Sequence, residues 1–205
     1  GHFSREAAQT VCGASLKEMM ALVNKSLLRR TEAGRYVVHE LLRQYAAEKL
    51  DWAEDGGTVA RNQHSVYYIK MLQRFGQDIK GPRQQTALAE IEAEGENIRA
   101  AWHWAVTQNE AVWLGQAMAG LGYFYIRRGR YQEGEAAFKM AASELKKDAT
   151  NGGRWIQANL VAWQAVFSYQ LGQVELARQL LQKSLALLDD PKLTDLEAQA
   201  ARAFT

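Results

Sequence analysis

Cysteine and proline are almost absent from this 205-residue sequence, which contains one of the first and two of the second. The lone Cys12 excludes an internal disulfide framework and a four-cysteine zinc site. With so few prolines, long helices contain almost no residues that would break them. No apolar run approaches the roughly 20 residues that a membrane-spanning helix needs. The sequence therefore favours a protein built mainly of helices and stabilised by a hydrophobic core.

An excess of charge of one sign is also missing. The 25 basic and 23 acidic residues leave a net charge of +2, too small to hold a protein on nucleic acid by charge alone. Hydrophobic residues make up 47% of the chain and charged residues 23%, which is typical of globular proteins. The sequence does not open on a charged-then-apolar leader, so we expect a cytoplasmic location.

The first fifty residues have the pattern helix, helix, hairpin, helix. Ser4 is placed to cap the first helix, and Ser15 and Glu18 have the spacing of a capping box for the second. Two short apolar runs flank Gly34 and predict a small β-hairpin, and helical spacing resumes at His39. We interpret residues 1–50 as a partial winged-helix domain that lacks its first helix.

A helical connector is predicted for residues 51–109. Residues 51–58 read as a linker, and apolar residues at helical spacing predict helices over 59–75 and 86–107. From residue 110 to 205 the spacing of small and large residues recurs, Gly134 being matched by Ala177 43 residues later. The predicted fold class is thus all-α with one small β-hairpin, the connector being followed by a truncated α-solenoid.

The repeat resembles the tetratricopeptide repeat (TPR). Leu121, Gly122, Tyr125, Phe138 and Ala141 occupy the positions of that pattern, although the 43-residue period exceeds the usual 34. The resemblance implies a concave face formed by the first helix of each pair, where a protein, a peptide or a small molecule would bind. The residues expected to line it are Gln116, Tyr123, Arg127, Asn159, Val166, Tyr169 and Gln170. The alternative is that so few repeats curve too little to bind anything.

Four segments resemble the STAND class of signalling ATPases, the bacterial relatives of plant resistance proteins and apoptotic scaffold ATPases. Residues 3–8 (Phe-Ser-Arg-Glu-Ala-Ala), 22–28 and 34–46 are similar to the winged-helix arm of that class. Residues 94–105 (Glu-x-Glu-Asn-Ile-Arg-Ala-Ala-Trp-x-Trp-Ala) are similar to the segment that precedes the repeats in its bacterial regulators.

This resemblance implies a non-enzymatic regulatory and sensor region. In STAND proteins a nucleotide-binding domain precedes the winged helix, and exchange of ADP for ATP releases an effector. Val38-His39-Glu40 falls at the Met-His-Asp motif of the class, which implies that His39 senses the nucleotide in the full-length protein. The chain has no Gly-x4-Gly-Lys-Ser/Thr loop, so we expect no cofactor on this fragment itself and ADP or ATP in the full-length protein. An oligomer on activation would fit the class.

Other interpretations remain open from the residues alone. His39 at a strand-to-helix junction could instead be a cap or a packing residue. Lys25, Arg29, Arg30, Arg35 and Arg43 could contact DNA phosphates, but residues that would read bases are not evident, so we do not expect direct DNA contact. The chain could also be the inducer-sensing portion of a bacterial transcription regulator whose DNA-binding domain lies elsewhere.

Metal and catalytic chemistry find little support in the sequence. The histidines His2, His64 and His103 lie in different segments without convergent donors, so no metal site and no catalytic residue is predicted. Glu90, Glu92, Glu94 and Glu96 alternate along a predicted helix and are expected on a solvated surface. Cys12 is expected in the core.

Overall fold

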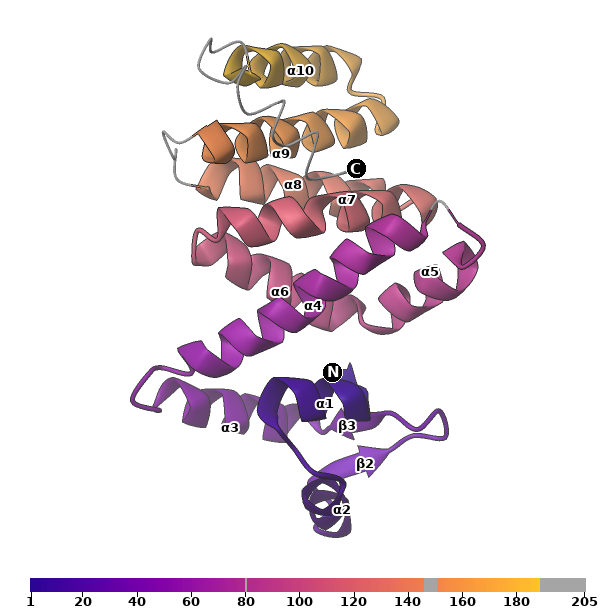
Figure 1. The fold of residues 1–205 in the computed structure, drawn as a ribbon, viewed down its shortest axis with the longest axis vertical. Helices are drawn as coiled ribbons and strands as arrows, with labels where there is room; N and C mark the ends of the chain where they lie inside the picture. The colour runs from indigo at the N-terminus through magenta and orange to yellow at the C-terminus, as the bar shows by residue number, and fades with distance from the viewer. Residues whose placement is uncertain (80, 146–150, 189–205) are drawn as a thin grey trace. The chain divides into compact units, whose positions relative to one another are not determined.

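The computed structural model describes residues 1–79, 81–145 and 151–188. Its residues divide into two compact units, Gly1–Trp104 and the part of the chain from Ala105 on, so that the boundary falls inside one helix. Helices dominate both units, and three short strands form a small sheet in the first (Figure 1). The predicted all-α class with a small hairpin is confirmed. Among the described helices, none combines the length and apolarity needed to cross a membrane.

The first unit begins with a small sheet and three helices. The chain order is β1 (His2–Phe3), α1 (Arg5–Cys12), α2 (Leu16–Asn24), β2 (Leu28–Arg30), β3 (Tyr36–Val38) and α3 (Glu40–Asp51). Strand β3 lies between β1 and β2 and pairs antiparallel with both. The hairpin β2–β3 was predicted, whereas β1 was not, because two residues are too few to show an alternating pattern.

Side-chain caps define where α1 and α2 begin. The Ser4 hydroxyl accepts a hydrogen bond from the Ala7 amide at 3.0 Å. Ser15 accepts from the Glu18 amide, while the Glu18 carboxylate accepts from the Ser15 amide at 2.8 Å, which completes the predicted capping box. Each cap satisfies backbone amides that a helix start leaves without a partner inside the helix. The sequence located both helix starts correctly.

A small core holds the sheet to α1 and α2. Ala8, Met19 and Tyr36 are buried in it, and the Phe3 ring stacks on the Tyr36 ring at 5.9 Å between centroids. Cys12, which we expected in this core, is exposed instead. It occupies the last turn of α1, where its thiol lies beside the Ala8 carbonyl of its own helix.

Helices α4 (Thr58–Asp78), α5 (Gln84–Ala93) and α6 (Gly95–Thr107) follow the loop after α3. The sequence predicted one continuous helix over 86–107, and that prediction was wrong. Glu94 ends α5, with its amide bonded to the Ile91 carbonyl, and α6 begins at the next residue, Gly95. The core of these helices comprises Tyr68, Ile69, Leu72, Phe75, Leu88, Ile91, Ile98, Ala101 and Trp102.

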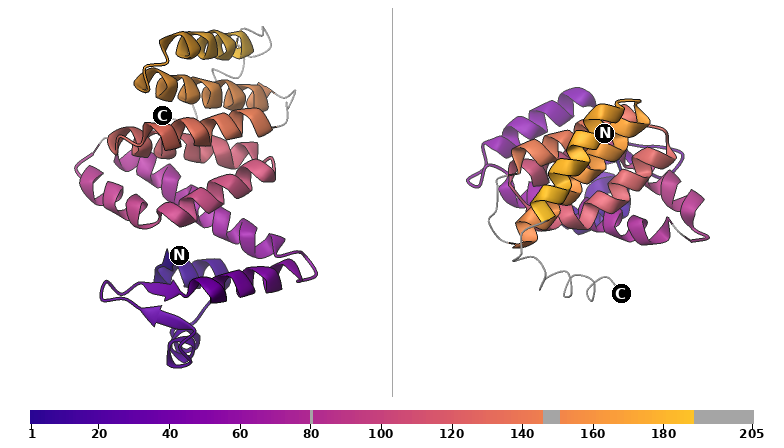
Figure 2. Two further views of the ribbon diagram at one scale, coloured as in Figure 1. Left: turned by 180° about the vertical axis from the view of Figure 1, so that it is seen from behind. Right: turned by 90° about the horizontal axis from the view of Figure 1, so that it is seen from above.

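The second unit contains α7 (Ala111–Arg127), α8 (Tyr131–Glu144), α9 (Asn151–Gln170) and α10 (Val174–Leu188). Successive helices pack side by side and run back and forth, with α9 between α8 and α10 (Figure 2). Gly134 of α8 allows close approach of α9, because a Cβ there would lie 2.5 Å from the Phe167 ring. Gly122 of α7 faces the Trp163 ring in the same way. The small residues of the repeat pattern thus lie where helices touch.

Candidate functional site around Glu94

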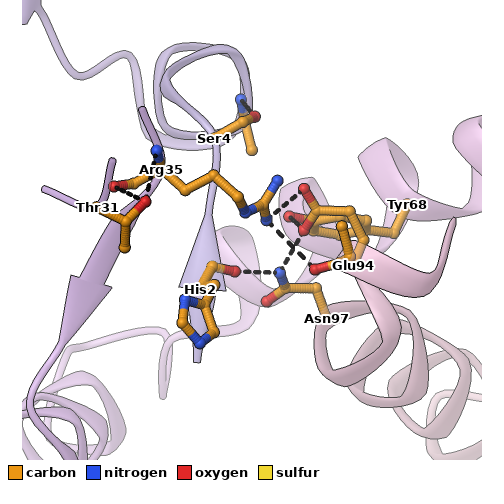
Figure 3. Close-up of polar contacts among 9 residues, drawn as sticks. His2, Ser4, Thr31, Arg35, Tyr68, Glu94 and Asn97 are labelled. Atoms are coloured by element: carbon orange, nitrogen blue, oxygen red, sulfur yellow. Dashed lines mark hydrogen bonds and ion pairs between the residues drawn. The ribbon is translucent and has the colours of Figure 1, made fainter. Parts of the chain in front are cut away.

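A buried carboxylate joins four segments of the first unit. Glu94, only 5% exposed, lies between α5 and α6 and forms an ion pair of 2.7 Å with Arg35, which precedes β3. Its Oε2 accepts hydrogen bonds from the Tyr68 hydroxyl at 3.2 Å and from the Asn97 amide at 2.7 Å (Figure 3). The Asn97 amide also donates to the His2 carbonyl at 2.8 Å. We call His2, Arg35, Tyr68, Glu94 and Asn97 the Glu94 cluster.

Local structure places each member of the cluster. Arg35 follows the turn of the β2–β3 hairpin, where its amide donates to the Thr31 hydroxyl and its carbonyl accepts from the Thr31 amide at 2.8 Å. Tyr68 lies on the buried face of α4, and Asn97 lies in the first turn of α6. The break between α5 and α6 therefore brings Glu94 and Asn97 together with a hairpin about sixty residues away.

Burial and charge set the protonation of the groups around the carboxylate. Burial, and then the Glu94 charge, raises the pKa of the Tyr68 phenol, so Tyr68 remains a hydrogen-bond donor. Burial lowers the pKa of the His64 imidazole, whose ring packs on Tyr68 at 4.7 Å between centroids. The arrangement compensates a buried charge with a cation and two further donors, which suits an inter-element clamp rather than a proton-transfer site.

Sequence reasoning missed this cluster. Glu94 was predicted on a solvated surface, and the structure shows that prediction to be wrong because Arg35 covers the carboxylate from the hairpin. A usable signal was present, however: Ile91 and Ile98 lie three residues before and four after Glu94, and both are buried. An acidic residue within an apolar stripe implies a buried partner.

His39, the predicted nucleotide-sensing residue, is the N-cap of α3. Its Nδ1 accepts a hydrogen bond from the Leu41 amide at 3.3 Å, and the residue is exposed. In this chain His39 therefore acts as a helix cap, as one of the two interpretations from the sequence expected. Its role toward a nucleotide remains a prediction.

Helix α3, which His39 caps, leaves several of its apolar side chains uncovered. None of its residues is buried, and Leu41 is 69% exposed, Tyr45 58%. The C-cap residue Trp52 is 73% exposed, with the Lys49 ammonium 4.2 Å from its ring centroid. An apolar helix face of this kind normally lies against another element.

Two of the five cations considered for DNA contact are engaged within the chain. Arg35 binds Glu94, and Arg43 forms two hydrogen bonds to the Glu40 carboxylate, which lower the Glu40 pKa to about 2. Lys25, Arg29 and Arg30 are exposed. Three of the five cations are therefore without a carboxylate partner among the described residues, fewer than the sequence suggested for contact with DNA phosphates.

The predicted concave-face residues lie on two helices that contact each other, α7 and α9. Tyr123 and Asn159 are half-buried, the Tyr123 ring meeting the edge of Trp163 at 5.3 Å and the Asn159 amide donating to the Trp155 carbonyl at 2.8 Å. Tyr169 is 61% exposed and Val166 37%. Exposed side chains are also found at Gln116, Arg127 and Gln170. The binding function of this face remains a prediction.

Comparison with known proteins gives no match to a family model, to a curated protein or to a solved structure.

Proposed function

We propose that this chain is the regulatory and sensor region of a STAND-type signalling ATPase, a relay rather than an enzyme. In this proposal the α7–α10 helices bind a protein, peptide or small-molecule signal in the manner of TPR repeats. The N-terminal helices and hairpin, acting as the winged-helix arm, pass the signal to a nucleotide-binding domain outside this sequence. The signal would favour the arrangement that exchanges ADP for ATP.

The observation that carries the proposal is the Glu94 cluster. An arm that transmits a movement must move as one body with the helices behind it. The Arg35–Glu94 ion pair fastens the hairpin to the junction of α5 and α6, and the Asn97–His2 hydrogen bond fastens the first strand to the same place. Because Glu94 is buried, displacing Arg35 would leave the carboxylate without its cation. Displacing the His2 carbonyl would cost a hydrogen bond of the Asn97 amide, and the two costs together make the joint stiff.

The uncovered face of α3 supports the same proposal. Leu41 and Tyr45 would be buried by a nucleotide-binding domain packed on this helix, and His39 at its start would then reach the nucleotide. Burial of such side chains contributes roughly 25 cal/mol per Å² of apolar surface removed from water.

The test uses the protein that contains the nucleotide-binding domain and separates the two roles of His39. His39→Asn retains a side-chain cap for α3, whereas His39→Ala removes both the cap and the imidazole. We expect both variants to retain less ADP after gel filtration and to signal without stimulus. If His39→Asn retains ADP as well as the parent, the imidazole acts only as a cap and the nucleotide role is wrong.

The relay is tested with Glu94→Gln in the same protein. We expect ADP retention without signal to be unchanged and signal-triggered exchange to be at least tenfold slower, because the arm no longer moves with its helices. Glu96→Gln, an exposed neighbour in α6, serves as the matched control. Equal exchange rates in the Glu94→Gln variant and the parent protein would contradict the relay role.

A further inference from the structure

A pocket of about 430 Å³ lies within the first unit, between α1 and α4. Helix α1 contributes Glu6 and Thr10 to its lining, and α4 contributes the remaining residues. The floor consists of the half-buried Val66, Tyr67 and Met71. A volume of this size suits a small organic molecule.

Two cations line this pocket. Lys70 and Arg74 are four residues apart on α4, both exposed, and among the described residues neither forms an ion pair. Like charges at this spacing repel each other and destabilise a helix slightly. A bound anion would remove that repulsion and gain two charge-assisted hydrogen bonds.

The pocket lining also contains a carboxylate. Glu6 is its acidic residue, and burial, followed by the Glu6 charge, raises the pKa of the Tyr67 phenol. Tyr67 also meets the ring of Tyr68, a member of the Glu94 cluster, at 4.9 Å between centroids. The lining of the pocket thus combines an apolar floor with two cations and one carboxylate.

We propose that this α1–α4 pocket binds a small organic anion with a flat apolar body, of the class of aromatic carboxylates and sulfonates. The apolar body lies on Val66, Tyr67 and Met71, and the anionic group lies between Lys70 and Arg74. The proposal is independent of the nucleotide role of His39 and of signal binding at α7–α10.

The test uses the chain described here and two probes that differ in charge. The anionic probe is 8-anilinonaphthalene-1-sulfonate, and N-phenyl-1-naphthylamine is its neutral counterpart. We expect the anionic probe to bind saturably and the Lys70→Glu/Arg74→Glu variant to bind it at least tenfold more weakly. The control Lys139→Glu/Lys183→Glu makes the same change of net charge on α8 and α10 and should bind like the parent.

Methionine methyl resonances locate the bound probe, because the five methionines are spread along the chain. We expect the Met71 methyl resonance to shift saturably in the parent and not in the Lys70→Glu/Arg74→Glu variant, while Met118 and Met140 of α7 and α8 do not shift. The neutral probe should bind at least tenfold more weakly than the anionic one and respond to neither charge variant. An unshifted Met71 resonance, or equal binding of both probes by the parent, would overturn the proposal.

Discussion

Glu94 shows how one residue acquires a role that its neighbours in sequence do not indicate. Four glutamates alternate from Glu90 to Glu96. Glu90 pairs with Arg83 at the surface, and only Glu94 is buried, where it pairs with Arg35. The difference arises from the helix break at Glu94, which turns that carboxylate toward the hairpin.

At this scale we expect Glu94→Gln to lower the free energy of unfolding by about 2 kcal/mol, because it removes the charge that compensates Arg35. The loss is smaller than for a fully buried pair, since the Arg35 side chain is 22% exposed and can reach water. Urea denaturation measures the effect. Glu96→Gln, whose side chain is 66% exposed, should change stability by less than about 0.5 kcal/mol, and equal losses in the two variants would argue against a buried ion pair.

His64 provides a prediction about pH. Its folded-state pKa is lowered by burial, so between that pKa and the ordinary value of about 6.5 the unfolded chain binds more protons than the folded one. Stability contributed by neutral His64 is thus fully present above about pH 6.5 and is lost as the pH falls through the lowered pKa. His64→Gln should flatten the fall in unfolding free energy measured from about pH 7.5 to about pH 5.5. An unchanged slope would show that other groups cause it.

At the scale of elements, close helix approach depends on single glycines. A methyl group at Gly134 would meet the Phe167 ring, which itself stacks on Phe138 and Trp163 and cannot easily move. We expect Gly134→Ala to destabilise the protein by about 1–3 kcal/mol despite the better helix propensity of alanine.

Gly152 is the matched control for this substitution. It lies in α9 with open space around the position of its Cβ, so Gly152→Ala should leave the melting temperature unchanged or raise it. Thermal unfolding followed by circular dichroism checks both variants. Destabilisation by Gly152→Ala, or none by Gly134→Ala, would show that the approach of α8 and α9 does not depend on Gly134.

Elements also differ in how well the sequence predicted them. The starts of α1, α2 and α3 were predicted because Ser4, Ser15 and His39 mark them with local signals. The division between α5 and α6 was not predicted, because the spacing of apolar residues continues through Glu94 without a break. Strand β1 escaped prediction because its partner, β3, lies more than thirty residues along the chain.

At the scale of the whole molecule, the buried side chains of each unit belong mainly to a few of its helices. In the second unit Leu160 of α9 is 0% exposed, whereas Leu185 of α10 is 60% exposed. We expect Leu160→Ala to cost about 2–5 kcal/mol of unfolding free energy and Leu185→Ala less than about 0.5 kcal/mol. Chemical denaturation of both variants checks this. Similar losses would mean that α10 is covered in solution.

The first unit shows the same contrast between its buried and uncovered helices. Tyr68, Ile69 and Leu72 of α4 are buried, whereas Leu41 and Tyr45 of α3 remain exposed although their spacing is that of an amphipathic helix. The sequence pattern predicts which face of a helix is apolar but not whether this chain covers it. Because Leu41 and Tyr45 are uncovered in this chain, we propose that another domain packs on α3.

The sequence by itself determined the helical class, the hairpin and the principal helix starts, because apolar periodicity, capping side chains and turn glycines act over only a few residues. Only the tertiary structure decided that Glu94 is buried, that Cys12 is exposed and that α3 is uncovered. Burial depends on which distant segment lies opposite a residue. For Glu94 that segment is the hairpin carrying Arg35, whose ion pair crosses 59 positions of the chain.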